Sequence, residues 1–183
     1  LDYSQSNIYI GLLKSAFKEA FNILDKIAVF LNRYFGLGRN ESSIYFDSIW
    51  VKDKKKDRTL PEALLNTENM SLYALYDIYK DFQSGYYQTL KEIRHALTHR
   101  QLTIFEVGVA DIQKDGDLLS IDSAEMVIQT IQLMRLVKAA IIYLINAVTI
   151  EEKEKHKNFP SDKLGTIRVS TAQLEDFQGR REV

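Results

Sequence analysis

Apolar residues near the start of the chain recur at alternating three- and four-residue steps. The series comprises Ile10, Leu13, Phe17, Ala20, Leu24, Ile27, Leu31 and Tyr34. Such spacing places one apolar stripe along a helix, so we predict a helix over about residues 6–35. Gly36 and Gly38 follow directly and predict the end of that helix.

Similar patterns predict further helices. Asn69 is a suitable N-cap for a helix that runs to about Phe82. The segment "DSAE" at 122–125 is typical of a capping box, which would open a last long helix ending near His156. The most apolar run of that helix, 139–148, is too short to span a bilayer. We therefore predict that this run is buried.

Other segments carry shorter or extended patterns. Residues 43–51, "SIYFDSIWV", are aromatic and β-branched, which predicts either a strand or an irregular packed loop. The segments "LTIFEVGV" and "LLSI" flank "QKDGD", and their alternation with the Asp-Gly pair between them predicts a β-hairpin, or at least an extended excursion of the chain. Residues 60–66 predict a short helix, with Pro61 in its first turn.

Together these elements predict a mainly α fold. We expect a four- or five-helix bundle with a short β-hairpin-like insertion before the last long helix. The bundle would span residues 1–156, and the polar residues 157–183 would form a C-terminal arm or extension.

Composition narrows the function classes. The chain has 183 residues, a net charge of −1 and no cysteine. Disulfides and thiolate metal sites are excluded, and binding to nucleic acid must depend on a local patch rather than on overall charge. We find no signal peptide and expect a cytoplasmic protein without a membrane segment. Because the chain begins at Leu1, we read it as a fragment or a processed form, to which a missing N-terminal partner domain could belong.

The helix that follows Gly85 contains the segment "RHALTH", with Arg94, His95 and His99. In one interpretation these residues are only the polar face of an amphipathic helix. In a second, Glu92, His95 and His99 share one helix face and bind a metal ion. In a third, histidine moves protons and arginine binds phosphate, which is the chemistry that metal-free cleavage of RNA requires.

The third interpretation has a geometric difficulty. A five-residue separation places Arg94 and His99 about 140° apart around an ideal helix and about 7.5 Å apart along it. The two side chains converge if the helix ends near His99 and frees the imidazole to turn. They also converge if two copies of the chain face each other across a two-fold axis.

The motif, its place in a late helix, and the segments "AFNILDKIAVFLN" and "LYALYDIYKDF" resemble the HEPN superfamily over roughly residues 1–155. The resemblance implies a metal-independent endoribonuclease in which the RNA 2′-hydroxyl attacks the adjacent phosphate and leaves a 2′,3′-cyclic phosphate. By position, His99 would be the general acid or base, Arg94 would stabilise the phosphate, and His95 would assist. Leu102 occupies the place where some HEPN toxins have a modified tyrosine.

The resemblance also implies the biological setting. We expect an RNA substrate, a homodimer with a composite active site, a regulatory domain or antitoxin partner, and a role in bacterial defence or toxin-like growth control. No cofactor and no metal are expected. The alternative is a non-catalytic HEPN module that dimerises and serves as an interaction domain of a larger protein.

Further residues are candidates for RNA contacts. Asn22 and Lys26 would line the cleft opposite the motif, or else make only local contacts on the helix surface. Arg100 would bind a phosphate, or else interact with the helix dipole. Tyr86 and Tyr87 share the motif helix and could stack on bases. The basic segment 52–58 carries interleaved aspartates, so we predict a solvated loop there.

Overall fold

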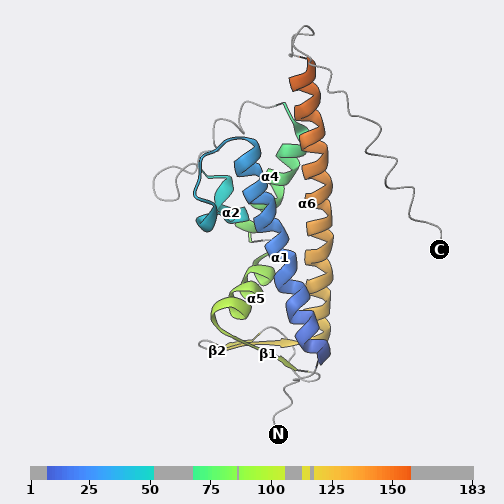
Figure 1. Ribbon diagram of the computed structural model, residues 1–183. Coiled ribbons are helices and arrows are strands. Elements are labelled where there is room, and N and C mark those ends of the chain that lie inside the picture. Colours follow the sequence, from blue (N-terminus) through green and yellow to red (C-terminus); the bar gives the residue numbers. More distant parts are fainter. Residues whose placement is uncertain (1–7, 52–67, 86, 106–112, 116–117, 158–183) are drawn as a thin grey trace, which may run out of the picture. The chain divides into compact units, whose positions relative to one another are not determined.

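The computed structural model of the chain describes residues 8–51, 68–85, 87–105, 113–115 and 118–157 (Figure 1). Residues 1–151 form one compact unit, and residues 152–183 form a second. The elements in chain order are α1 (Ile8–Tyr34), η1 (Glu41–Ser43), α2 (Phe46–Ile49), α4 (Met70–Gln83), α5 (Gln88–His99), β1 (Gln101–Phe105), β2 (Gln113–Asp115), β3 (Leu118–Asp122) and α6 (Ser123–Lys157). The mainly α prediction is confirmed.

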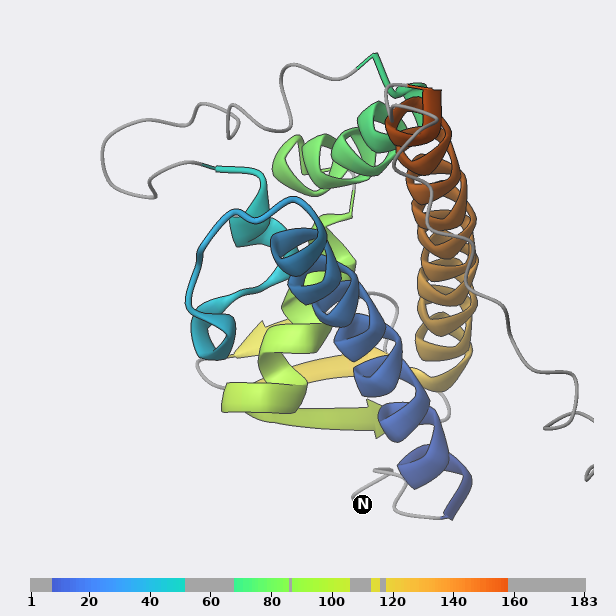
Figure 2. The same cartoon turned by 45° about the horizontal axis from the view of Figure 1, so that its top comes forward.

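The first predicted helix is α1, and its apolar stripe is the centre of the core. Phe17, Leu24 and Leu31 are completely buried. The helix ends where Gly36 adopts φ +61°, a left-handed conformation that glycine adopts without a Cβ penalty. Figures 1 and 2 show α2 and α5 on one side of α1 and α6 on the other.

The segment 43–51 is neither a strand nor an irregular loop, so that prediction is wrong. It contains the short helix α2, in which Phe46 and Ile49 are buried, followed by the buried Trp50. The Ser48 hydroxyl accepts a hydrogen bond from the backbone N–H of Tyr45 at 2.9 Å, and this local bond favours a turn over a strand. Arg39 donates to the carbonyls of Ser48 and Val51 at the end of the helix.

The insertion before α6 is a three-stranded sheet with the order β1-β3-β2. The hairpin-like part is confirmed, because β2 and β3 pair antiparallel. The predicted antiparallel pairing of "LTIFEVGV" with "LLSI" is wrong, because β1 and β3 run parallel from Gln101↔Leu118 to Phe105↔Asp122. Parallel strands need a connection of about a dozen residues, and residues 106–117 provide that length.

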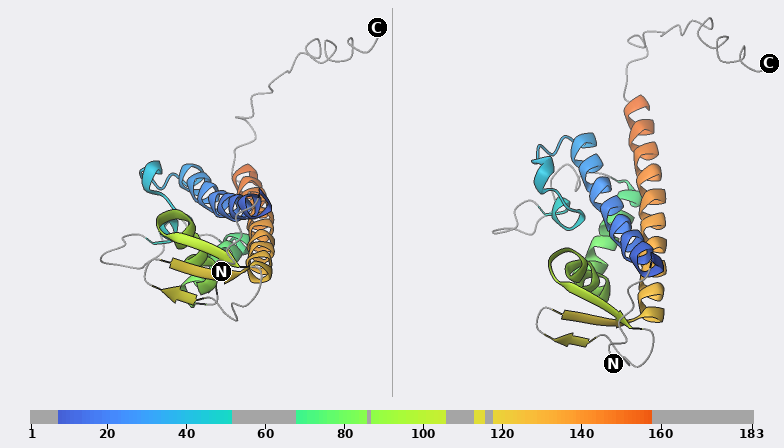
Figure 3. Two further views of the ribbon diagram at one scale, coloured as in Figure 1. Left: turned by 90° about the horizontal axis from the view of Figure 1, so that it is seen from below. Right: turned by 60° about the horizontal axis from the view of Figure 1, so that its bottom comes forward.

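The predicted helix caps are present. Asn69 caps α4 through bonds from the N–H groups of Ser71 and Leu72, and its amide also donates to the carbonyl of Ala147 at 2.8 Å. Asp122 accepts a bond from the N–H of Ala124 at 2.8 Å at the start of α6. Figure 3 shows β3 leading directly into α6.

The prediction that 139–148 is buried is wrong for four of its ten residues, which are exposed. Ala140 and Ala147 are buried, whereas Ile141, Ile142 and Ile145 are exposed. The rest of the unit formed by residues 1–151 covers only one face of α6, so the apolar residues on the opposite face are exposed to solvent. Among the described residues, α6 is the one helix long and apolar enough to cross a membrane by length and composition, and only 28% of its most apolar window is buried.

Several predicted features lie outside the described residues. These are the short helix at 60–66, the loop at 52–58, Tyr86 and the arm from 158 onward. Within the second unit, the structure describes the end of α6, where Lys155 pairs with Glu152 at 2.8 Å and Lys157 pairs with Glu154 at 2.5 Å.

Candidate active site

A cleft of about 610 Å³ lies where α1, α5 and the segment around α2 meet. Arg94, His95 and His99 all line it, together with residues of α1 and residues at the start of α2, from Tyr45 to Asp47, which we call the α2 segment. The lining residues are Phe17, Lys18, Phe21, Asn22, Asp25, Tyr45, Asp47, Lys91, Arg94, His95, Leu97, Thr98 and His99. The structure thus brings the predicted catalytic residues to one concave surface of one chain.

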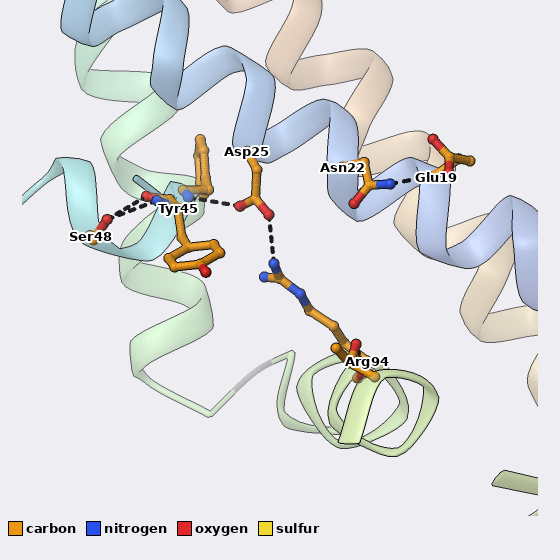
Figure 4. A network of polar contacts seen from close by, with 8 residues as sticks. Glu19, Asn22, Asp25, Tyr45, Ser48 and Arg94 are labelled. Carbon is orange, nitrogen blue, oxygen red and sulfur yellow. Dashed lines mark hydrogen bonds and ion pairs between the residues drawn. The ribbon is translucent and has the colours of Figure 1, made fainter. Parts of the chain in front are cut away.

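Arg94 extends from α5 toward α1, where its guanidinium is held on two sides (Figure 4). Its Nη2 bonds to Asp25 Oδ2 at 2.6 Å, and its Cζ lies 4.8 Å from the centre of the Phe21 ring. Both side chains of the ion pair are partly buried, with exposures of 30% for Arg94 and 19% for Asp25. A guanidinium has five N–H donors, and this ion pair uses one of its nitrogens.

Asp25 also binds the segment that carries α2. Its Oδ1 accepts a hydrogen bond from the backbone N–H of Phe46 at 2.9 Å, while its Oδ2 accepts from Arg94. One carboxylate on α1 therefore connects α5 with the start of α2 (Figure 4). A charge-assisted contact of this length holds an arginine side chain in a defined orientation.

The two motif histidines lie one turn apart, with ring centroids 5.2 Å from each other. Both are exposed, and both line the cleft. His99 is the last residue of α5, because Arg100 adopts an extended conformation with φ −136° and ψ −167°. The helix thus ends at His99, which is the first of the two arrangements that could bring its imidazole toward Arg94.

Other charged side chains complete the cleft. Lys18 and Lys91 line it with Arg94, opposed by the acidic Asp25 and Asp47. Lys91 Nζ lies 4.0 Å from Asp47 Oδ2. Three cations against two carboxylates leave a modest positive balance, to which protonated histidines would add. The cleft is therefore locally positive although the net charge of the chain is −1, and a locally positive cleft favours an anionic ligand.

The predicted RNA-binding residues lie in three different places. Asn22 lines the cleft and donates to Glu19 Oε1 at 3.1 Å (Figure 4). Lys26 is exposed and is not part of the cleft lining. Arg100 lies at a separate hollow of about 250 Å³ that it shares with Glu92 and His95. The RNA contacts of all three residues stay predictions.

Two other predictions concern residues near the motif. In the described part of the chain, no three His, Asp or Glu side chains are grouped as ligands for one ion, so the alternative metal site of Glu92, His95 and His99 is not formed. Tyr87 is half-buried, and its ring packs 5.1 Å from that of Phe82 rather than lining the cleft.

The sequence analysis did not identify Asp25, Lys18, Lys91 or Asp47 as site residues. A signal for two of them was present, because Lys18, Asn22 and Asp25 follow one another at steps of four and three residues and so share a face of α1. Asp47 gave no signal, since its position depends on how the α2 segment packs against α1.

A comparison with known proteins identifies the family of this chain. The family model described as LA2681-like HEPN matches residues 1–151. No curated protein matches the chain, and no solved structure matches it. The family match covers every residue of the cleft, the sheet, and the helices up to residue 151 of α6. The chain therefore belongs to the LA2681-like HEPN family.

Proposed function

We propose that this protein is a metal-independent endoribonuclease. Membership of the HEPN family suggests a nuclease or another RNA-related function. The observation that carries the finer proposal is that Arg94, His95 and His99 line one cleft, in which the guanidinium is fixed by Asp25. A fixed cation and two imidazoles in one cleft are the kinds of group that metal-free cleavage of RNA requires, a stabilising positive charge and carriers of protons.

In the proposed reaction, the neutral imidazole of His99 takes the proton of a ribose 2′-hydroxyl. The 2′-oxygen then bonds to the adjacent phosphorus, and the bond from phosphorus to the 5′-oxygen breaks. The leaving oxygen takes a proton from an imidazolium, with His95 assisting because its ring is 5.2 Å from that of His99. The products are a 2′,3′-cyclic phosphate and a 5′-hydroxyl.

Arg94 would stabilise the charge that builds on the phosphate oxygens. A guanidinium stays protonated throughout and can bind two of these oxygens at once. Its contact with Asp25 at 2.6 Å fixes the direction of the side chain before RNA binds, so less reorganisation is needed in the transition state. Lys18 and Lys91 would hold neighbouring phosphates.

The test is cleavage of labelled RNA in excess EDTA by the wild type, Arg94→Ala and His99→Ala. We expect wild-type cleavage with a cyclic phosphate end, and losses of about 10²-fold or more in both variants. The matched controls are Arg33→Ala, an exposed ion-paired arginine outside the cleft, and His156→Ala, the remaining histidine. Cleavage that stops on chelation, or that both cleft variants retain, would refute the proposal.

We also propose that the domain acts in the cytoplasm in bacterial defence or toxin-like growth control, under a regulatory domain or antitoxin partner. Support for this setting comes from the family alone. A composite active site shared by two copies is part of the same proposal. Mixing inactive Arg94→Ala with inactive His99→Ala would restore cleavage if each chain contributes residues to the other's cleft, and would not restore it otherwise.

A non-catalytic interaction module is the second candidate function, and the exposed apolar face of α6 favours it. Absence of cleavage from any RNA, with self-association intact, would support the module over the nuclease.

A further inference from the structure

The uncovered face of α6 carries a regular apolar stripe. We call it the α6 seam, and its six positions are Val127, Ile131, Met134, Lys138, Ile141 and Ile145. The five apolar members are between 38% and 59% exposed. The residues that α6 buries, which include Met126, Leu133, Val137 and Ala140, lie on a different face. The seam is thus additional to the core-facing side of the helix.

Steps of four and three residues alternate along the seam, which is the spacing of the contact positions in paired helices. The order of these steps reads the same in both directions. A second copy running antiparallel would therefore place Val127 opposite Ile145, Ile131 opposite Ile141, and Met134 opposite Lys138. We propose that two copies of this chain associate through the α6 seam as an antiparallel, two-fold symmetric pair.

Lys138 determines the orientation. A parallel pair in register would place two Lys138 ammonium groups against each other, whereas the antiparallel pair places each lysine beside Met134 of the second copy. A flexible thioether accommodates the aliphatic stem of a lysine while its ammonium group reaches solvent. A single polar residue in an otherwise apolar seam is a known means of fixing how helices pair.

The exposed apolar area of the α6 seam approaches what an interface with a second copy of the chain requires. The apolar seam residues together with the exposed Ile128 and Ile142 would cover on the order of 600 Å² per copy, against the roughly 800 Å² that each partner contributes to a stable interface. A membrane-spanning helix fits less well, because Arg135 and Lys138 lie in the middle of the apolar stretch and would meet hydrocarbon.

The seam is independent of the proposed catalytic function. Figures 1 and 2 show α6 on the side of α1 away from α2 and α5, and none of the seam residues lines the cleft. A composite active site would need another contact between copies. The association can therefore be tested on the His99→Ala variant, whether or not the wild type cleaves RNA.

The first experiment measures the mass of the full chain by sedimentation, for the wild type, Ile131→Glu and Ile150→Glu. Ile150 lies on the same helix and is exposed, but it is outside the seam. We expect a wild-type dimer that Ile131→Glu weakens by about tenfold or more, while Ile150→Glu leaves it unchanged. Circular dichroism verifies folding, which an exposed position should preserve. A wild type that stays monomeric, or equal effects of both variants, would overturn the proposal.

The second experiment reads the orientation and uses the absence of native cysteine. Under mild oxidation, a mixture of Ile131→Cys and Ile141→Cys should form a mixed disulfide, and neither variant alone should cross-link. Cross-linking of each variant with itself would overturn the antiparallel arrangement. A monomer that instead binds phosphatidylcholine and phosphatidylglycerol vesicles through the seam would identify a membrane as the occupant and overturn the pairing.

Discussion

Replacing Asp25 tests the network that holds Arg94. Asp25→Ala removes both the ion pair at 2.6 Å and the acceptor for the Phe46 N–H at 2.9 Å. Exposed ion pairs contribute about 0–1 kcal/mol, and breaking a fully buried pair costs about 3–5 kcal/mol. With exposures of 30% and 19%, this pair lies between those limits. We expect Asp25→Ala to lower the free energy of unfolding by about 1.5–3 kcal/mol.

Asp25→Asn separates the two functions of this carboxylate. An amide oxygen can still accept from the Phe46 N–H, but the charge that attracts Arg94 is lost. The loss of stability should therefore be smaller, about 1–2 kcal/mol. Catalysis should fall more steeply, because a guanidinium displaced by about 1 Å costs up to 10²-fold in rate. The cleavage assay in EDTA and urea unfolding followed by Trp50, the single buried tryptophan, measure the two effects.

Two controls distinguish positioning from general destabilisation. Glu41→Gln removes the exposed ion pair with Arg33 and should change neither cleavage nor unfolding appreciably. A double-mutant cycle with Asp25→Asn and Arg94→Ala should give non-additive losses of stability, since both variants break the same contact. Additive losses, or full cleavage by Asp25→Asn, would refute the claim that Asp25 positions the arginine.

Three further predictions concern single residues. Asn69→Ala removes a cap and a buried amide that bonds across to α6, and should lower the free energy of unfolding by about 2–4 kcal/mol in urea. Lys91→Ala should weaken the binding of uncleavable RNA and reduce by about one the slope of log K against log salt concentration. The effects of Lys26→Ala and Arg100→Ala should be smaller, because Lys91 lines the cleft and these two residues do not. Burial lowers the pKa of Lys14 below its ordinary value of 10.5. The folded state therefore loses this proton first, and the stability of the wild type relative to Lys14→Met should rise with pH up to about that value and then level off.

The long helices were predictable because their apolar positions repeat over many turns. The stripe from Ile10 to Tyr34 gave α1 to within two residues at its start, and Asn69 marked the start of α4. The segment 43–51 was not predictable in the same way, since a short aromatic run buries equally well as a strand or a turn of helix. Its helix depends on the local bonds between Tyr45 and Ser48.

The strand pairing and the site partners depend on contacts distant in sequence. A local pattern shows that β1 and β3 are strands, but the parallel pairing follows from where α5 and α6 leave the sheet. The motif residues were recognisable from their chemistry. Asp25 lies 69 residues before Arg94, and only the packing of α1 against α5 brings the two together.

The sheet provides a reason for the position of His99. Arg100 leaves the helical conformation because the next residues, beginning with Gln101, pair with β3. His99 is still helical and keeps its place about 140° around the axis from Arg94, but no further helical turn follows it, so its imidazole has room to turn toward the cleft. Pairing of β1 with β3 therefore ends α5 at the residue whose imidazole has to turn toward the cleft. The β insertion lies outside the motif in the sequence, and its pairing sets the end of the motif helix.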